Sequence, residues 1–424
     1  MARPLRICFV AYRGNMQCGG QGIYLWFLAR ELARQGHAVD VIVGPPYPDP
    51  MPFAGRVIRV QNQMFWAKWF LRDAAQMLPR PQPLRALLPL TFYELAASRL
   101  GFLPEPFAFS LRALAAIRRA MQGGRRYDLV HDVQCLGYGL LALRALGLPV
   151  VTTVHHPLTV DRRASFVRDQ NLRDRIGTML FYPIGMQSFV ARRLDRVLTS
   201  SEASAADLQR DFGIRPERIA RVANGLDTGI FSPDPAAPRA HDELLCVGRA
   251  SDPNKGVHTL LRALALLPQR VTLTLVDSPR SEARRWAAEL GCGERLHLAG
   301  HVSQDELVRL YRRAALVVVP SRHEGFGLPA AEAMACGAPV VATRAGALPE
   351  LLRVGGGGVL AERDCPESLA RQIAGLLEAP ERRAELGAQG RAGIARAYGW
   401  PRIAARTAAE YRAVLHARTA AAAA

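Results

Sequence analysis

The sequence predicts an α/β protein with two Rossmann-like, doubly wound parallel-sheet domains. The chain has 424 residues, and a single hydrophobic core stops growing at roughly 250–300 residues. Hydrophobic residues make up 49% of the chain, which is enough to bury two sheets. Short apolar runs that do not alternate with polar residues recur in both halves, as is typical of strands buried on both faces of a parallel sheet.

The first half begins with a β-turn-α-β unit, the start of a parallel sheet. Its expected parts are a strand at Leu5–Ala11, a turn at Arg13–Gly22, a helix at Ile23–Gln35 that ends at Gly36, and a strand at Ala38–Val43. Further strands are expected at Asp128–Val133, Val150–Val154 and Arg196–Ser200. The proline-rich segment from about Met51 to Met121 is expected to be an insertion of helices and loops.

A composition shift at Phe231–Ala240 marks the predicted domain boundary, which gives domains 1–230 and 231–399. In the second domain, strands are expected at Leu244–Val247, Val271–Val276, Leu296–Ala299, Leu316–Val319 and Val340–Thr343. From Pro366 onward the pattern is helical. We expect residues 400–424 to cross back onto the first domain.

The formal charge of +18 calls for an anionic partner, which can be nucleic acid, an acidic membrane face or a phosphate-rich ligand. Of the 55 basic residues only Lys68 and Lys255 are lysine, so the choice of lysine at either position is notable. Seven cysteines without a CxxC pair indicate reduced thiols. The chain shows no signal-peptide pattern and no apolar run of about 20 residues, so we expect a cytoplasmic location.

The strongest motif is Glu324-Gly325-Phe326-Gly327-Leu328-Pro329 followed by Glu332. It places two carboxylates on either side of a helix start, where unpaired N–H groups can bind a diphosphate. The two carboxylates are then placed to meet different parts of one ligand, its sugar and its ribose. In the alternative, Glu332 only complements the helix dipole and Glu324 is solvated.

Two further loops carry phosphate-binding character. Arg249 follows a predicted strand and Lys255 precedes a predicted helix, so a guanidinium and an ammonium can reach one diphosphate. The alternative is a pair of solvated cations. Gly19 and Gly20 lie in the first βα turn, where missing side chains let the backbone approach a ligand, although a plain tight turn explains them equally.

His155 and His156 follow the predicted strand at Val150–Val154, at the end where ligands bind in parallel sheets. They can be proton carriers or structural caps. No acidic cluster or third histidine is near them in sequence, and the chain contains no Asp-x-Asp triplet. We therefore predict no metal site and no cofactor beyond a nucleotide-sugar co-substrate.

Taken together, these motifs resemble the retaining family-four glycosyltransferases of the GT-B fold (glycosyl transferases group 1). The resemblance covers nearly the whole chain. It implies two domains that face each other across a cleft, and metal-independent transfer of a hexose from a nucleotide diphosphate donor to a glycan, lipid or small molecule. Asp277-Ser278-Pro279-Arg280 departs from the glycine-rich turn usual in the family, so the edge of the donor pocket is expected to differ.

The resemblance also implies roles for individual residues. The catalytic set would be His155, Glu324, Arg249 and Lys255. The donor-binding set would be Gly19, Gly20, Arg249, Lys255, Val302, Glu324, Gly325, Phe326, Gly327, Leu328 and Glu332. Within these sets, Arg249 and Lys255 would hold the diphosphate, Glu332 the ribose and Glu324 the sugar, while the backbone near His301 and Val302 would meet the base.

Three alternatives stay open. Another enzyme on this fold, such as a nucleotide-sugar epimerase or a phosphorylase, would share these motifs. A basic nucleic-acid-binding protein is favoured by the charge alone, and we expect no nucleic-acid partner because the sequence shows no binding module. The segment from Met64 to Leu71 mixes aromatic residues with Lys68, so it predicts either peripheral attachment to an anionic membrane or a core-facing helical stripe.

Overall fold

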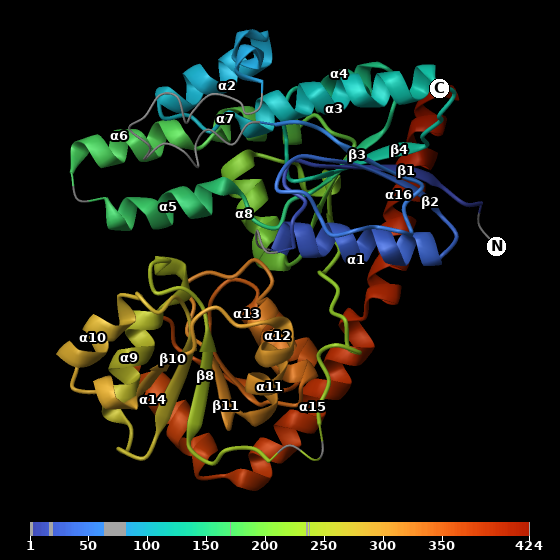
Figure 1. Cartoon of the computed structure of the whole chain (residues 1–424). Helices are drawn as coiled ribbons and strands as arrows, with labels where there is room; N and C mark the ends of the chain where they lie inside the picture. Colours follow the sequence, from blue (N-terminus) through green and yellow to red (C-terminus); the bar gives the residue numbers. More distant parts are fainter. Residues whose placement is uncertain are drawn as a thin grey trace. The chain divides into compact units, whose positions relative to one another are not determined.

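A computed structural model of the chain describes residues 3–16, 20–62, 82–169, 171–234, 236 and 238–423. It contains two compact units (Figure 1). The N-terminal unit comprises Met1–Ser200, Ser204–Ala223 and Trp400–Ala424, and the C-terminal unit comprises Ser201–Ala203 and Asn224–Gly399. The division falls before Asn224, not before Phe231 as predicted. The reason is that the N–H of Leu226 donates to the carbonyl of Tyr398 at 2.7 Å, which joins the linker to the C-terminal unit.

The N-terminal unit has a seven-stranded parallel sheet with the strand order β3-β2-β1-β4-β5-β6-β7. Its strands are β1 (Arg6–Ala11), β2 (Ala38–Val43), β3 (Arg56–Arg59), β4 (Leu129–Val133), β5 (Val150–Thr153), β6 (Arg196–Thr199) and β7 (Ile219–Arg221). The two edge strands β3 and β7 were not predicted. The expectation of only helices and loops between Met51 and Met121 is therefore wrong, because β3 is a short, partly exposed strand that has no buried apolar run to reveal it.

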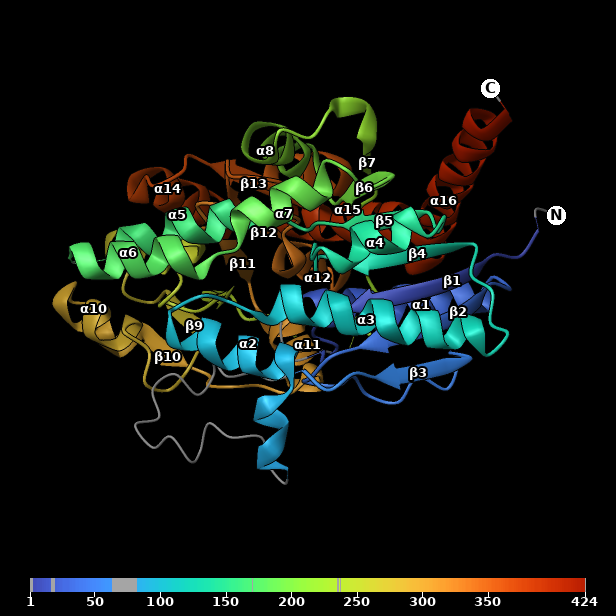
Figure 2. The same ribbon diagram turned by 90° about the horizontal axis from the view of Figure 1, so that it is seen from above.

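Helices cover both faces of this sheet. Figure 2 shows α3 (Glu105–Gln122) and α4 (Gly139–Ala145) together on one face, while α1 (Gly20–Arg34) and α16 (Trp400–Ala423) pack against each other on the other. The remaining helices are η3 (Pro83–Leu87), α2 (Pro89–Arg99), α5 (Leu158–Arg168), α6 (Leu172–Phe181), α7 (Ile184–Ala191), α8 (Glu202–Phe212) and η4 (Pro216–Arg218). Helix α1 begins at Gly20, so the turn predicted to run to Gly22 is shorter.

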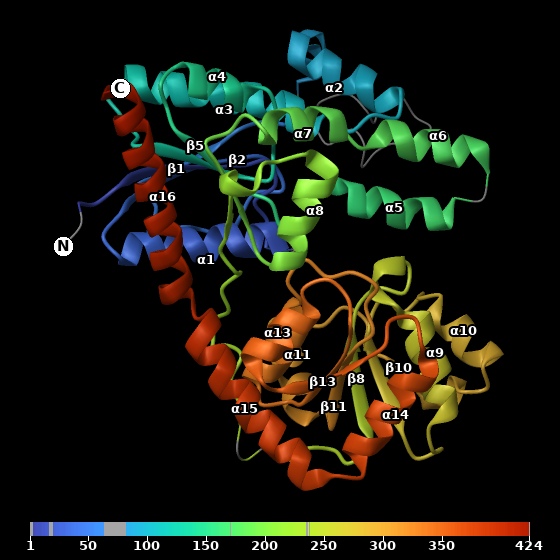
Figure 3. The same ribbon diagram turned by 180° about the vertical axis from the view of Figure 1, so that it is seen from behind.

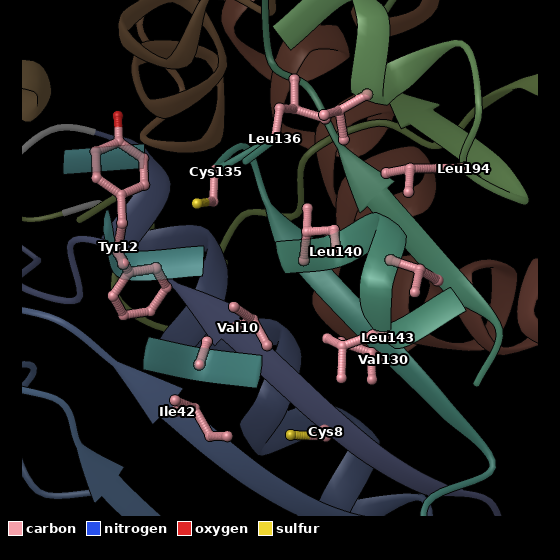
Figure 4. Close-up of a cluster of buried hydrophobic side chains, with 14 of the residues drawn as sticks. Cys8, Val10, Tyr12, Ile42, Val130, Cys135, Leu136, Leu140, Leu143 and Leu194 are labelled. Carbon is pink, nitrogen blue, oxygen red and sulfur yellow. The ribbon is translucent and has the colours of Figure 1, made fainter. Parts of the chain in front are cut away.

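The core on the α3 and α4 face is built from the apolar runs that predicted the strands. Figure 4 shows Val10 of β1 and Ile42 of β2 directed toward the same buried cluster as Leu140 and Leu143 of α4. All four side chains are fully buried. Fully burying a side chain of this type contributes about 1.5–3 kcal/mol, so this layer fixes where the carboxyl ends of the strands lie.

The C-terminal unit has a six-stranded parallel sheet with the order β10-β9-β8-β11-β12-β13. Its strands are β8 (Glu243–Val247), β9 (Thr272–Val276), β10 (Leu296–Leu298), β11 (Leu316–Val319), β12 (Val340–Thr343) and β13 (Gly358–Ala361). The first five match predicted strands. Strand β13 was missed, because its glycine-rich surroundings hide a short edge strand.

Helices cover this second sheet on both faces too (Figure 3). They are η5 (Pro253–Lys255), α9 (Val257–Leu266), α10 (Ala283–Glu289), η6 (Gly293–Arg295), α11 (Gln304–Arg313), α12 (Leu328–Ala335), α13 (Leu348–Gly355), α14 (Pro366–Leu377) and α15 (Pro380–Tyr398). Helices α9, α10 and α14 form one layer, and α11, α12, α13 and α15 form the other.

The strand order places a topological switch point between β8 and β11. These strands are neighbours, but the chain leaves β8 toward α9 on one face and leaves β11 toward α12 on the other. Loops that leave in opposite directions open a crevice at the carboxyl ends of the strands, which is where ligands bind in such sheets. The loops after β8 and β11 are also the ones that carry the two strongest sequence motifs.

Candidate donor-binding site

An ion pair at this switch point joins the two motif loops. The ammonium of Lys255, from the loop after β8, donates to the carboxylate of Glu324, from the loop after β11, at 2.7 Å. The hydroxyl of Ser321 donates to the same oxygen at 2.8 Å. The Glu324 side chain is 10% exposed and that of Lys255 is 28% exposed. The pair is thus shielded but reachable from solvent.

Two glycines let the backbone close tightly around this pair. Gly256 has φ +62°, and a Cβ there would lie 2.0 Å from the carbonyl oxygen of Pro320. Gly346 has φ +52°, and a Cβ there would lie 2.2 Å from the carbonyl oxygen of Glu324. Because a side chain would force backbone apart at both points, these glycines set the positions of Lys255 and Glu324.

The local environment keeps Lys255 charged. Burial disfavours the ammonium, but the attraction and hydrogen bond of Glu324 outweigh burial, so the pKa of Lys255 is raised. Gly248 packs against the aliphatic stem of Lys255, since a Cβ there would be 3.3 Å from it. The next residue, Arg249, is exposed and forms no ion pair or side-chain hydrogen bond with the rest of the described chain. The loop after β8 therefore offers two cations to one ligand.

The start of α12 lies directly after Glu324 along the chain. Gly327 adopts φ +91° as the cap of this helix, and Pro329 is the second residue of the helix. The ring of Phe326 is buried and packs 5.3 Å from the ring of Tyr398. Leu328, the first residue of this helix, is half-buried. The first N–H groups of a helix have no partner within the helix, so this helix start can receive an anion.

The second carboxylate of the motif is held by a residue that the sequence did not single out. Tyr311 of α11 is fully buried, and its hydroxyl donates to Glu332 Oε2 at 2.8 Å. Burial of the carboxyl raises the pKa of Glu332 to about 7, and the hydrogen bond from Tyr311 opposes that rise in part. Glu332 as a whole keeps partial exposure.

These contacts predict that the affinity of the site for its ligand depends on pH. If Glu332 accepts hydrogen bonds from a bound ligand, its ionised form binds better, so affinity is expected to fall as pH drops through about 7. Tyr311→Phe removes a bond that favours ionisation, so the midpoint should move to higher pH. The loss of affinity at neutral pH should be roughly five-fold, or about 1 kcal/mol. Calorimetric titration of nucleoside diphosphates across pH checks both expectations.

Tyr411→Phe is the matched control, because it removes a buried tyrosine hydroxyl from the N-terminal unit. The pH midpoint of nucleoside diphosphate binding in Tyr411→Phe should equal that of the wild type. A Tyr311→Phe midpoint that moves to lower pH, or stays fixed while the fold is intact, would contradict the positioning of Glu332 by Tyr311.

Asp277 explains how the chain replaces the glycine-rich turn expected after β9. Its carboxylate is nearly buried and accepts hydrogen bonds from the N–H of Ala250 at 2.8 Å and from the N–H of Ser278 at 2.7 Å. Asp277 therefore ties its own turn to the loop that carries Arg249. The departure was visible in the sequence, but its partner in the loop after β8 was not.

His155 lies in the N-terminal unit, at the carboxyl end of β5, as predicted. The backbone N–H of His155 donates to Gln134 Oε1 at 2.9 Å, and its backbone carbonyl accepts a hydrogen bond from the Ser204 hydroxyl at 3.0 Å. Its ring meets the ring of Tyr24 edge-on, with 4.9 Å between centroids. Gln134 adopts φ +53°, an uncommon conformation for a residue other than glycine, so the backbone is constrained where it holds His155.

A buried hydrogen-bonded chain stands behind His155, and sequence reasoning missed it. His131 Nε2 lies 2.7 Å from Thr153 Oγ1, and Tyr24 Oη lies 2.9 Å from the same oxygen. The other ring nitrogen of His131 contacts the hydroxyl of Tyr411 on α16. Burial lowers the pKa of His131 to about 3, so the ring is neutral. This series of hydrogen bonds connects α16 to the ring of Tyr24, which packs against His155.

The other predicted positions are distributed as follows. Gly20 opens α1, and Val302 and His301 lie just before α11 in the C-terminal unit. His156 Nε2 pairs with Asp161 at 3.2 Å, which favours the structural alternative for this histidine. Gly19 lies outside the described residues, as do Lys68 and the rest of the segment from Met64 to Leu71. Among the described residues, no group of three or more histidine, cysteine or acidic side chains is arranged to hold a metal ion.

Comparison with known proteins gives a consistent family. Residues 18–229 match the model described as Glycosyltransferase Family 4, and residues 231–393 match Glycosyl transferases group 1. The chain is 37% identical over 416 residues to an MMP alpha-(1->4)-mannosyltransferase from Mycolicibacterium hassiacum, covering 96% of this chain and 98% of the relative.

Two solved structures share the fold. Sucrose-phosphate synthase from Thermosynechococcus elongatus superposes with a TM-score of 0.72 at 24% identity, covering 97% of this chain and all of that one. Anabaena Alr3699/HepE in complex with UDP-glucose gives 0.68 at 21% identity, covering 96% and 100%. With both halves of the chain matched and a relative aligned over nearly its whole length, the chain belongs to the group 1, family-four glycosyltransferases of the GT-B fold.

Proposed function

We propose that this glycosyltransferase moves a hexose from a nucleotide diphosphate donor to a saccharide acceptor with retention of the anomeric configuration. The observation that carries the proposal is the pairing of Lys255 with Glu324 at 2.7 Å at the switch point of the C-terminal sheet. A cation for a diphosphate and a carboxylate for sugar hydroxyls are thereby held side by side. Family membership supplies the reaction class.

In the proposed reaction, the bond between the sugar's anomeric carbon and the diphosphate oxygen breaks while the acceptor oxygen attacks from the same face. The acceptor's proton passes to the departing diphosphate. Lys255, Arg249 and the N–H groups at the start of α12 would stabilise the negative charge that develops on the leaving group. Glu324 would orient the sugar, Glu332 the ribose, and His155 would lie beside the reacting carbon.

The relative from Mycolicibacterium hassiacum supports a choice of sugar and linkage. Its name describes an alpha-(1->4)-mannosyltransferase, and it aligns with 96% of this chain. We therefore propose mannose as the transferred hexose and an α-(1→4) bond to the acceptor.

Two experiments in sequence test the function. A thermal-shift screen of UDP-, GDP- and ADP-sugars should reveal one preferred base, because a ligand at 100 times its dissociation constant adds about 2.7 kcal/mol of stability. Transfer from that donor is then followed by NMR, where retention gives an α-linked product from an α-linked donor. Conversion without an acceptor would indicate an epimerase, consumption of inorganic phosphate would indicate a phosphorylase, and an inverted product would refute retention.

Transfer is expected to survive chelation. The chain contains no Asp-x-Asp triplet, and Lys255 with Arg249 offers positive charge to the diphosphate. Assays after exhaustive treatment with EDTA should keep nearly the full rate. Complete loss that manganese or magnesium restores would show that a divalent ion carries this charge instead.

Peripheral attachment to an anionic membrane stays a prediction. Its sequence basis, from Met64 to Leu71, lies outside the described residues, but Leu84 and Leu87 of η3 are 79% and 76% exposed. No helix in the described part of the chain is long and apolar enough to cross a membrane. Wild type should sediment with anionic but not neutral liposomes, and Trp66→Ala with Trp69→Ala should weaken this. No binding at low salt would refute the attachment.

A further inference from the structure

We propose that Gln134 is a positioning residue for the transfer reaction and that it acts through His155. The inference rests on the proposed function, in which the ring of His155 lies beside the reacting carbon, and deepens it by naming the group that fixes this ring in place. Gln134 follows β4 directly and is only 2% exposed. Its loop neighbours the loop of His155, because β4 and β5 are paired in the sheet.

The side-chain amide of Gln134 binds the backbone of two consecutive residues after β5. Its Oε1 accepts a hydrogen bond from the N–H of His155 at 2.9 Å, and its Nε2 donates to the carbonyl oxygen of His156 at 2.9 Å. Strands β4 and β5 are paired up to Val133 and Thr153, so the amide continues the hydrogen bonding of the sheet beyond its last backbone pair. A planar amide holds its donor and its acceptor in a fixed relation, so the two bonds together restrict the backbone of His155.

The loop that carries Gln134 is held in an uncommon conformation. Gln134 and Leu136 both have φ +53°, a value that is rare for residues other than glycine. Such conformations persist only where the surrounding structure holds them, and they cluster at active sites. The fully buried carboxylate of Asp132 gives part of this support: it accepts from the N–H of Cys135 at 3.1 Å and of Leu136 at 3.2 Å. Figure 4 shows the side chains of Cys135 and Leu136 in the buried cluster, which anchors the loop from its other side.

Two further groups of the N-terminal unit complete the surroundings of His155. The hydroxyl of Ser204 on α8 donates to its carbonyl oxygen at 3.0 Å, and the ring of Tyr24 on α1 meets its ring edge-on. The backbone and the ring of His155 are thus held by separate elements. Misplacing a reacting group by about 1 Å can lower a rate about 100-fold, so the loss of one of these contacts is expected to act on kcat.

Gln134→Glu tests the inference with a side chain of nearly the same shape. At about pH 8 the introduced carboxylate still accepts from the N–H of His155, but it cannot donate to the carbonyl oxygen of His156 and repels it. We expect kcat to fall about 10- to 100-fold. Affinity for the nucleoside diphosphate should stay at the wild-type value, because the residues proposed to bind it belong to the C-terminal unit. Steady-state kinetics and calorimetry on the full chain measure the two quantities.

Protonation should rescue this variant. A protonated carboxyl has a hydroxyl donor beside its carbonyl acceptor, so it can form both hydrogen bonds of the original amide. Burial favours this neutral form, so the ratio of variant to wild-type kcat should rise as the pH is lowered from about 8 to about 5.5. Asp132, His155 and His156 lie beside this position in both proteins, so the ratio removes their shared response to pH. A constant ratio in a folded variant would contradict the inference.

A double-mutant cycle tests whether Gln134 acts through His155. In a His155→Ala background the ring is absent, so Gln134→Glu should lower kcat no further. A general disturbance of the loop would lower kcat in both backgrounds. Ser204→Ala removes a different hydrogen bond from the His155 backbone and should lower kcat several-fold in the wild-type background alone. Ser204→Ala therefore keeps the inference testable if Gln134→Glu fails to fold.

Gln209→Glu is the matched control, because Gln209 belongs to the same unit and is exposed on α8. It should keep the wild-type kcat at each pH. A wild-type kcat in Gln134→Glu, or additive effects in the cycle, would overturn the inference and leave the proposed function intact. A full rate in His155→Ala would refute the role that the proposed function gives His155, and the inference with it.

A readout without turnover separates this inference from the proposed function. NMR signals of the His155 ring are assigned by their absence from His155→Ala, and they should shift in Gln134→Glu but not in Gln209→Glu. If the wild type transfers no sugar, the proposed function fails, and these signals still show whether Gln134 positions the ring. Ring signals that are the same in Gln134→Glu and in the wild type would overturn the positioning role.

Discussion

Lys255→Ala is expected to lower kcat/KM by about 10²–10³, the usual loss when one group that stabilises developing charge is removed. Lys255 is held by Glu324 at 2.7 Å, and its pKa is raised, so it brings a fixed positive charge to the leaving diphosphate. Lys255→Arg should also be impaired, because a planar guanidinium cannot occupy the space of a compact ammonium between Gly248 and Glu324. Steady-state kinetics with saturating acceptor measure both effects.

Arg344→Ala is the control for a general loss of positive charge. Arg344 belongs to the same unit, pairs with Glu362 at 2.9 Å, and both side chains are more than half exposed. It should keep the wild-type rate, since exposed ion pairs contribute little. Melting curves accompany the kinetics, because Lys255→Ala leaves the Glu324 carboxylate with the Ser321 hydroxyl as its one side-chain donor in the described part of the chain and can lower stability as well. Near-normal turnover of Lys255→Ala at saturating donor would refute its role.

Glu332→Gln is expected to weaken donor binding about 10- to 100-fold, because hydrogen bonds to a charged group contribute about 1.5–3 kcal/mol. The stability of the fold should not decrease. Burial raises the pKa of Glu332 to about 7, so its charge is costly to the free protein and an uncharged side chain of the same shape removes that cost. We therefore expect an unchanged or higher melting temperature together with lower affinity, the combination typical of a residue retained for function.

Glu385→Gln provides the comparison for this substitution. Glu385 lies in the same unit, but it is exposed, and its side-chain partners among the described residues are its neighbours Arg382 and Gln389 on α15. Glu385→Gln should change neither the donor affinity nor the melting temperature. If Glu332→Gln lowers the melting temperature and leaves donor affinity intact, Glu332 is a structural residue, which is the alternative that the sequence left open.

The sequence predicted the central strands and the motif loops because the signals for both are local. Buried parallel strands such as β1 and β11 are continuous apolar runs, and Gly327 with Pro329 marks a helix start within a few residues. The edge strands β3 and β13 escaped prediction because they are short and partly exposed, so no apolar run distinguishes them. Their hydrogen bonds come from a neighbouring strand that is distant in sequence.

The partners of the motif residues could not be predicted for the same reason. Tyr311 is 21 residues from Glu332, and Asp277 is 27 residues from Ala250, so each contact depends on how separate elements pack. The same holds for His131, which reaches Tyr411 across 280 residues. A lone buried histidine or tyrosine in an apolar run carries no signal that it positions a functional side chain.

We propose that the switch point between β8 and β11 binds the nucleotide diphosphate of the donor. Calorimetric titration of the preferred nucleoside diphosphate into the full chain tests it most directly. We expect one site, with binding strongly weakened by Lys255→Ala and by Glu332→Gln but preserved in His155→Ala, because His155 belongs to the N-terminal unit and is assigned to the reacting carbon. Unchanged affinity in both C-terminal variants would contradict it.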